Sequence, residues 1–113
     1  MSLDVDLMVM QPSSVFSWNV THNLGEMARQ VDVGDDLNLY QVLWRPDEHE
    51  LTLAHEIADY LHVGWMTLTA EPEKYKAFNP PNGWGSYEGL VEFVANYRDA
   101  CYENPFAELA VSR

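Results

Sequence analysis

Hydrophobic and polar residues alternate near both ends of the chain. The alternation covers residues 3–9, 15–20 and 107–112, and a period of two is typical of a strand with one buried face. A turn at 11–14, with one proline and two serines, separates the first two segments and predicts a hairpin. We expect the third segment to close a small antiparallel sheet. The inward residues predicted for the first strand are Leu3, Val5, Leu7 and Val9.

Between these strands the apolar residues recur every three or four positions, which is typical of amphipathic helices. Asn23 is a candidate cap for a first short helix, with Glu26 reaching back to it. Asp35 or Asp36 is a candidate start for a second helix, which Pro46 ends. The predicted buried side of the first helix consists of Leu24, Met27, Ala28 and Val31.

Two longer helices are predicted in the second half of the chain. Thr52 is the candidate cap of one, Pro72 suits the first position of a brief helix, and Ser86 is the candidate cap of the last. The whole pattern predicts a helix-rich α+β single domain over residues 1–113, with a small antiparallel sheet formed by the N-terminal hairpin and the C-terminal strand. The apolar side predicted for the last helix consists of Tyr87, Leu90, Val91, Val94, Tyr97 and Cys101.

Charge restricts the classes of partner. The chain of 113 residues has 6 lysines and arginines against 18 aspartates and glutamates, a formal net charge of -12. Binding to DNA or RNA depends on cations that contact phosphates, so direct nucleic-acid binding is not expected. The same charge disfavours an anionic membrane surface and favours a basic protein partner.

The remaining composition predicts a cytoplasmic protein. Cys101 is the only cysteine, so no internal disulfide is expected, and the first residues lack the basic start and apolar block of a signal peptide. No apolar run approaches the roughly 18 residues that span a bilayer. We also expect no cofactor and no metal.

The segment NPPNGWGSYEGLVEFV, residues 79–94, has two interpretations. Gly85 and the backbone before Ser86 could approach an anionic ligand, with Trp84 beside it. No lysine follows the serine, and Glu88 in the first turn would repel an anion. The pattern therefore favours a stiff turn that precedes a helix.

Thr21-His22-Asn23 joins a predicted strand to a predicted helix. His22 could act as a general base, with Thr21 or Asn23 orienting a substrate. No nucleophile follows at a recognised spacing, so we favour the alternative in which Asn23 caps the helix and the His22 ring nitrogens bond to nearby backbone.

His55, Asp59 and His62 recur on one flank of the third helix. Two imidazoles and a carboxylate could bind zinc. The HExxH signature is absent, because an aspartate stands at position 59. We therefore interpret the three as partly exposed polar residues.

Two arginines stand beside apolar residues. Arg45 follows Trp44 at a helix end, where it could bind a carboxylate or phosphate or pair with a nearby acidic residue. Arg98 falls within the apolar stripe of the last helix, so a carboxylate partner or an anionic ligand is expected there.

Four acidic residues share the polar face of the last helix without a basic residue between them. A solvated helix face is the usual meaning of this pattern. Its alternative is an interaction face that imitates phosphates towards a basic protein. The four are Glu88, Glu92, Asp99 and Glu103.

Four segments, NVTHNLGEMA, LWRP, NGWGSYEGLVEFV and AELAVSR, resemble those of small hypothetical proteins from bacteriophage and prophage genomes. The resemblance implies a phage or prophage source and no specific activity. The segment VDVGDDLNLYQV departs from it, being longer and more acidic than the corresponding connection.

Two classes of function follow. The first is an acidic phage-type interaction protein that binds a basic host protein, for counter-defence or regulation, without catalysis. The second is a pocket for a small ligand such as a nucleotide or metabolite, or a small enzyme. That pocket would combine Thr21, His22, Asn23, Trp44, Arg45, Trp84, Gly85 and Ser86, with Arg98 as a further candidate anion ligand.

Overall fold

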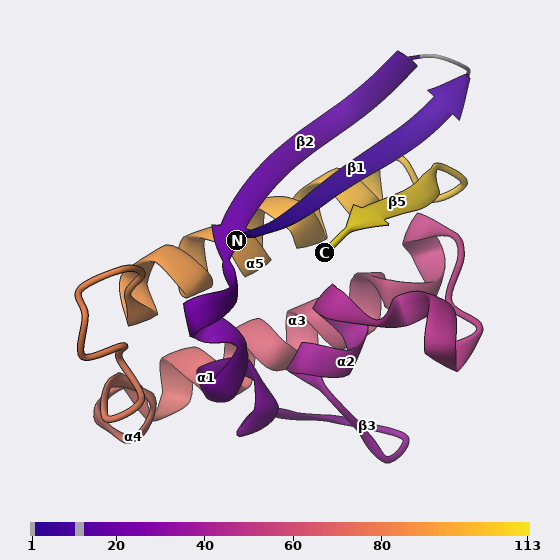
Figure 1. Cartoon of the computed structure of the whole chain (residues 1–113). Helices are drawn as coiled ribbons and strands as arrows, with labels where there is room; N and C mark the ends of the chain where they lie inside the picture. Colours follow the sequence, from indigo (N-terminus) through magenta and orange to yellow (C-terminus); the bar gives the residue numbers. More distant parts are fainter. Residues whose placement is uncertain (1, 11–12) are drawn as a thin grey trace.

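A three-stranded antiparallel sheet packs against the helices in the computed structural model, which describes residues 2–10 and 13–113 (Figure 1). The strand order is β2-β1-β5. The strands are β1 Ser2–Met10, β2 Ser13–Thr21 and β5 Glu108–Ser112. The predicted α+β class and the pairing of the N-terminal hairpin with the C-terminal strand are therefore confirmed. Positions 11 and 12 of the predicted turn lie outside the described residues. Ser13 and Ser14 belong to β2, so the prediction that they form part of the turn is wrong.

The register gives the sheet one apolar face and one polar face. Val5 pairs with Trp18 on β2 and with Val111 on β5, and paired residues project from the same face. Asp4 pairs with Asn19 and projects from the opposite face.

Val9 does not follow the predicted pattern. Its side chain is 49% exposed, because this end of the β1–β2 hairpin extends beyond the helices (Figure 1). The prediction that Val9 is buried is wrong, whereas Leu3, Val5 and Leu7 are buried as expected.

Two 17-residue helices, α3 Ala54–Ala70 and α5 Tyr87–Glu103, pack against each other. Ser86 caps α5 as predicted, since its hydroxyl accepts the Gly89 N–H at 3.1 Å. Thr52 lies two residues before the start of α3, and Leu53 occupies the cap position, so the prediction that Thr52 caps this helix is wrong. There the carboxylate of Glu56 accepts hydrogen bonds from the N–H groups of Thr52 and Leu53, at 3.0 and 2.8 Å. These bonds lower the pKa of Glu56.

The turn between β2 and the first helix differs from the prediction. A 3-10 turn, η1 His22–Leu24, precedes α1 Gly25–Arg29. Thr21 is the cap, because its hydroxyl accepts the Asn23 N–H at 3.3 Å. The prediction that Asn23 caps this helix is wrong, although Leu24, Met27, Ala28 and Val31 are buried as expected.

The acidic segment after α1 forms a hairpin instead of starting a helix. Strands β3 Asp32–Gly34 and β4 Leu37–Asn38 flank Asp35 and Asp36, whose φ angles are 54° and 61°. Tight hairpin turns require this left-handed conformation, which aspartate tolerates. Helix α2 Leu39–Trp44 begins only after Asn38, whose side chain accepts the Gln41 N–H at 2.9 Å.

Two short helices complete the chain: η2 Pro46–His49 after α2, and α4 Pro72–Lys76 between α3 and α5. Pro46 thus follows α2 as predicted, and Pro72 occupies the first turn of α4. None of the helices in the described ranges is both long and apolar enough to cross a membrane.

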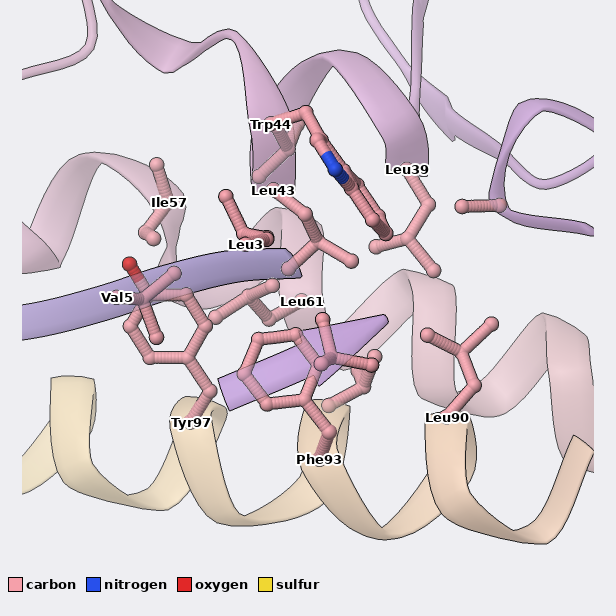
Figure 2. Packing of buried hydrophobic residues seen from close by; sticks show 14 of the residues in the cluster. Leu3, Val5, Leu39, Leu43, Trp44, Ile57, Leu61, Leu90, Phe93 and Tyr97 are labelled. Atoms are coloured by element: carbon pink, nitrogen blue, oxygen red, sulfur yellow. The ribbon is translucent and has the colours of Figure 1, made fainter. Parts of the chain in front are cut away.

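The core lies between the apolar face of the sheet and the helices (Figure 2). Leu3 and Val5 of β1 lie near Leu61 of α3 (Figure 2). The side chains of Phe93 and Tyr97 point towards them from α5. Gly64 of α3 allows a close approach, because a Cβ there would lie 3.0 Å from a Leu39 methyl group. This approach lets the start of α2 pack directly against α3.

Candidate functional site

A cavity beside α1 and α2 gathers positive charge in this acidic protein. Its volume is about 450 Å³, and none of its lining residues is acidic. Three of the chain's six lysines and arginines line it. We call this cavity the arginine pocket; it is lined by His22, Gly25, Arg29, Tyr40, Trp44, Arg45 and Arg113.

An aromatic pair on α2 supports the arginines. Tyr40 and Trp44 are one helical turn apart and stack, with ring centroids 5.2 Å apart. The guanidinium of Arg29 lies over the Tyr40 ring at 3.9 Å. Since Trp44 is only 2% exposed and Arg29 covers Tyr40, these rings serve as a support rather than as a free stacking surface.

The three guanidinium groups pair with carboxylates outside the pocket lining. Arg45 pairs with Glu48 at 3.0 Å, and Arg29 pairs with Glu26 at 3.5 Å. Arg113 pairs with Asp47 at 2.8 Å. Hydrogen bonding of the Arg45 guanidinium, as donor, to Tyr40 and Glu48 raises the pKa of Arg45. The predicted pairing of Arg45 with a nearby acidic residue is therefore confirmed.

Each guanidinium has five N–H donors, and these ion pairs use only some of them. Each arginine therefore keeps N–H donors that its carboxylate partner does not use.

His22 stands between the arginine pocket and a second cavity. Its ring contacts Trp44 edge-on, with centroids 6.2 Å apart. Its Nε2 atom is enclosed and has no hydrogen-bond partner within the described part of the chain. The prediction that both ring nitrogens bond to backbone is wrong for Nε2.

The second cavity, which we call the Trp84 cavity, has no lysine, arginine, aspartate or glutamate in its lining. It has a volume of about 570 Å³, and Trp84 at its edge is 71% exposed. Hydroxyl, amide and imidazole groups supply the other polar atoms. Its lining consists of Ser2, Asn19, Thr21, His22, Asn23 and Trp84.

The loop that carries Trp84 packs against the Thr21–Leu24 turn. Gly85 has a φ of 104°, and a Cβ added there would lie 2.7 Å from Thr21 Cγ2 and 3.0 Å from Leu24 Cγ. Asn82 accepts the Trp84 N–H at 2.9 Å. The turn interpretation of 79–94 describes this loop well, and the turn also places an exposed indole at a cavity.

The structure thus brings together most of the predicted pocket residues, divided between two cavities. Trp44 and Arg45 line the arginine pocket, Thr21, Asn23 and Trp84 line the Trp84 cavity, and His22 lines both. Gly85 supports the loop, and Ser86 serves as the cap of α5.

Arg98 lies apart from both cavities, between α5 and α3. Its Nε donates to Asp99 at 3.0 Å, and its guanidinium lies 4.8 Å from the Trp65 ring centroid. Its Nη1 lies 3.3 Å from His62 Nδ1, which must be the acceptor because arginine only donates. The expected carboxylate partner is present.

The histidine flank of α3 is engaged in other contacts. Asp59 accepts the Tyr102 hydroxyl at 2.9 Å, and the His55 ring meets Phe106 edge-on. Among the described residues, no group of three or more histidine, cysteine, aspartate or glutamate side chains is placed to bind a metal ion. Burial raises the pKa of the Cys101 thiol to about 12, so this cysteine is not a thiolate at neutral pH.

The acidic row on α5 is exposed along its whole length, and two of its members have cationic partners. Glu88 pairs with Lys76 of α4 at 3.7 Å, and Asp99 pairs with Arg98. Glu92 and Glu103 make no ion pair within residues 2–10 and 13–113.

Sequence reasoning missed several lining residues. Tyr40 precedes Trp44 by one helical turn, so that pair could have been found from spacing. Arg29 and Arg113 come from α1 and from the segment after β5, and no local pattern joins them. The other missed lining residues are Ser2, Asn19 and Gly25.

Comparisons with family models, with curated proteins and with solved structures gave no match to this chain. The resemblance to small phage and prophage proteins therefore stays a prediction.

Proposed function

We propose that the protein binds a small anionic ligand in the arginine pocket. The observation that carries this proposal is the convergence of Arg29, Arg45 and Arg113 on one cavity without an acidic lining residue. A planar guanidinium fork matches the oxygens of phosphate and carboxylate groups. A volume of about 450 Å³ lies within the usual range for small-molecule sites.

The negative net charge of the rest of the protein makes the cluster of three arginines the expected place for an anion to bind. A net charge of -12 repels anions from most of the surface. An anion therefore finds a favourable electrostatic interaction only where cations are concentrated. Since each arginine also pairs with a carboxylate of the protein, a ligand shares these donors with internal partners. We therefore expect modest, salt-sensitive affinity.

Isothermal titration with inorganic pyrophosphate tests the proposal. Wild-type protein should bind it, and Arg45→Gln should weaken binding by about tenfold, the effect of losing roughly 1.4 kcal/mol from a charge-assisted contact. Lys74→Gln is the matched control, because Lys74 is exposed and lies on α4, outside both cavities. Absence of pyrophosphate binding to the wild type, or equal weakening by both variants, would contradict the proposal.

The acidic row of α5 supports a second candidate function, the binding of a basic host protein by a phage-type interaction protein. Glu92 and Glu103 are exposed and without ion pairs in the described residues, so their charge is available to a partner. Glu92→Gln combined with Glu103→Gln should slow association with a basic partner isolated from host lysate. An unchanged association rate at low salt would count against this candidate.

A further inference from the structure

The arginine pocket and the Trp84 cavity share one residue, His22. We infer that they form a single extended site for a nucleoside monophosphate, with the phosphate among the arginines and the nucleoside in the Trp84 cavity. This inference rests on the proposed function, because it places the anionic group of the ligand in the arginine pocket.

The charges of the two cavities differ, and this difference orients the ligand. The arginine pocket has three cationic lining residues, whereas the Trp84 cavity has no lysine, arginine, aspartate or glutamate in its lining. Asp4 adjoins the lining of the Trp84 cavity, because it accepts a hydrogen bond from the amide of Asn19. A phosphate would be repelled by this carboxylate, so the charged end belongs in the arginine pocket.

The Trp84 cavity provides what an uncharged ring system needs. The indole of Trp84 is 71% exposed, and aromatic side chains stack on nucleobases of any sequence. Thr21 and Asn23 add a hydroxyl and an amide at the same cavity, which suit the hydroxyls of a sugar or the edge of a base. The rings of Tyr40 and Trp44 cannot take this role, since they are covered.

The loop geometry positions the backbone that carries the indole. Gly85 packs against Thr21 and Leu24 so closely that a Cβ would overlap Thr21 Cγ2. Trp84, the residue before it, is therefore fixed next to the turn that carries His22. The two cavities measure about 450 and 570 Å³, and each is large enough for one half of a mononucleotide.

Titration of the four ribonucleoside 5′-monophosphates, of inorganic phosphate and of the four nucleosides tests the inference. At least one monophosphate should bind wild-type protein about fivefold or more tightly than inorganic phosphate, the smallest gain expected from stacking one base. Trp84→Ala should remove this gain and leave phosphate binding unchanged. Phe106→Ala is the matched control, because Phe106 is 79% exposed and lies outside both cavities.

The outcomes separate the inference from the proposed function. If pyrophosphate binds but no monophosphate exceeds inorganic phosphate, or if Trp84→Ala retains the full gain, the extended site is wrong and the anion site stands. If neither pyrophosphate nor any monophosphate binds, both are wrong.

Discussion

Arg113 donates two hydrogen bonds to the carboxylate of Asp47, at 2.8 and 3.1 Å. The same guanidinium also donates to the backbone carbonyl of Trp44 at 3.2 Å. These contacts join the segment after β5 to the end of α2 and hold a cation at the arginine pocket. Trp44 and Arg113, which are 69 positions apart in the sequence, thus line one pocket.

The Asp47–Arg113 pair predicts a pH-dependent contribution to stability. The hydrogen bond from Arg113 lowers the pKa of Asp47, so the stabilisation is present above the unfolded carboxyl pKa of about 4. It is lost as the pH falls through the still lower folded value. Urea unfolding should show wild-type protein slightly more stable than Arg113→Gln at pH 7, with the difference shrinking towards pH 3. A difference that grows on acidification would contradict this assignment.

The two glycines beside Trp84 predict unequal effects of alanine. Gly83 and Gly85 both have positive φ, but an added Cβ meets nothing within 4 Å at Gly83 and lies 2.7 Å from Thr21 at Gly85. Gly83→Ala should cost about 1 kcal/mol for the left-handed backbone. Gly85→Ala should cost clearly more, because steric overlap is added. Chemical denaturation measures both, and equal losses would show that the loop does not pack on Thr21.

Two buried tyrosine hydroxyls predict opposite effects of phenylalanine. Tyr97 is fully buried, and its hydroxyl has no partner within the described residues; burial raises its pKa. Tyr97→Phe removes an unsatisfied polar group and should raise the free energy of unfolding by about 1 kcal/mol. Tyr87 donates to the Leu68 carbonyl at 2.7 Å, so Tyr87→Phe should lower it by about 1 kcal/mol. Destabilisation by both changes would indicate a partner for Tyr97.

The acidic hairpin turn predicts a stabilising substitution. Asp35 and Asp36 both have positive φ, and glycine at the second turn position favours this geometry. Asp36→Gly should raise the melting temperature, with a gain of up to about 1 kcal/mol. Asp36→Ala retains the strained backbone without the polar side chain and should lower it. The opposite order would contradict the turn assignment.

Periodicity predicted the elements whose side chains face one core. The alternation of β1 holds as far as Leu7, since burial on one face imposes the period. Most of the predicted stripe of α5 is buried as well, although Val91 is only partly buried and the buried Phe93 was missed. Asp35 and Asp36 were mistaken for a helix start because aspartate suits both a helix cap and a left-handed turn. Only the three-dimensional arrangement shows which applies.

The candidate site was predictable only in part. Trp44 and Arg45 are neighbours in sequence, and Thr21, His22 and Asn23 form one turn, so local reasoning identified them as candidates. Arg29 and Arg113 reach the same pocket from α1 and from beyond β5. Their convergence depends on the packing of α2 against its neighbours, which no local pattern records.

The most direct measurement of the central claim is an NMR titration with pyrophosphate that follows the arginine Nε–Hε signals. Arg29, Arg45 and Arg113 line the pocket, whereas Arg98 lies between α3 and α5 and serves as an internal control. The account predicts saturable shifts for the three pocket arginines and an unchanged Arg98 signal. Shifts at Arg98 alone, or no saturable shift at any arginine, would contradict it.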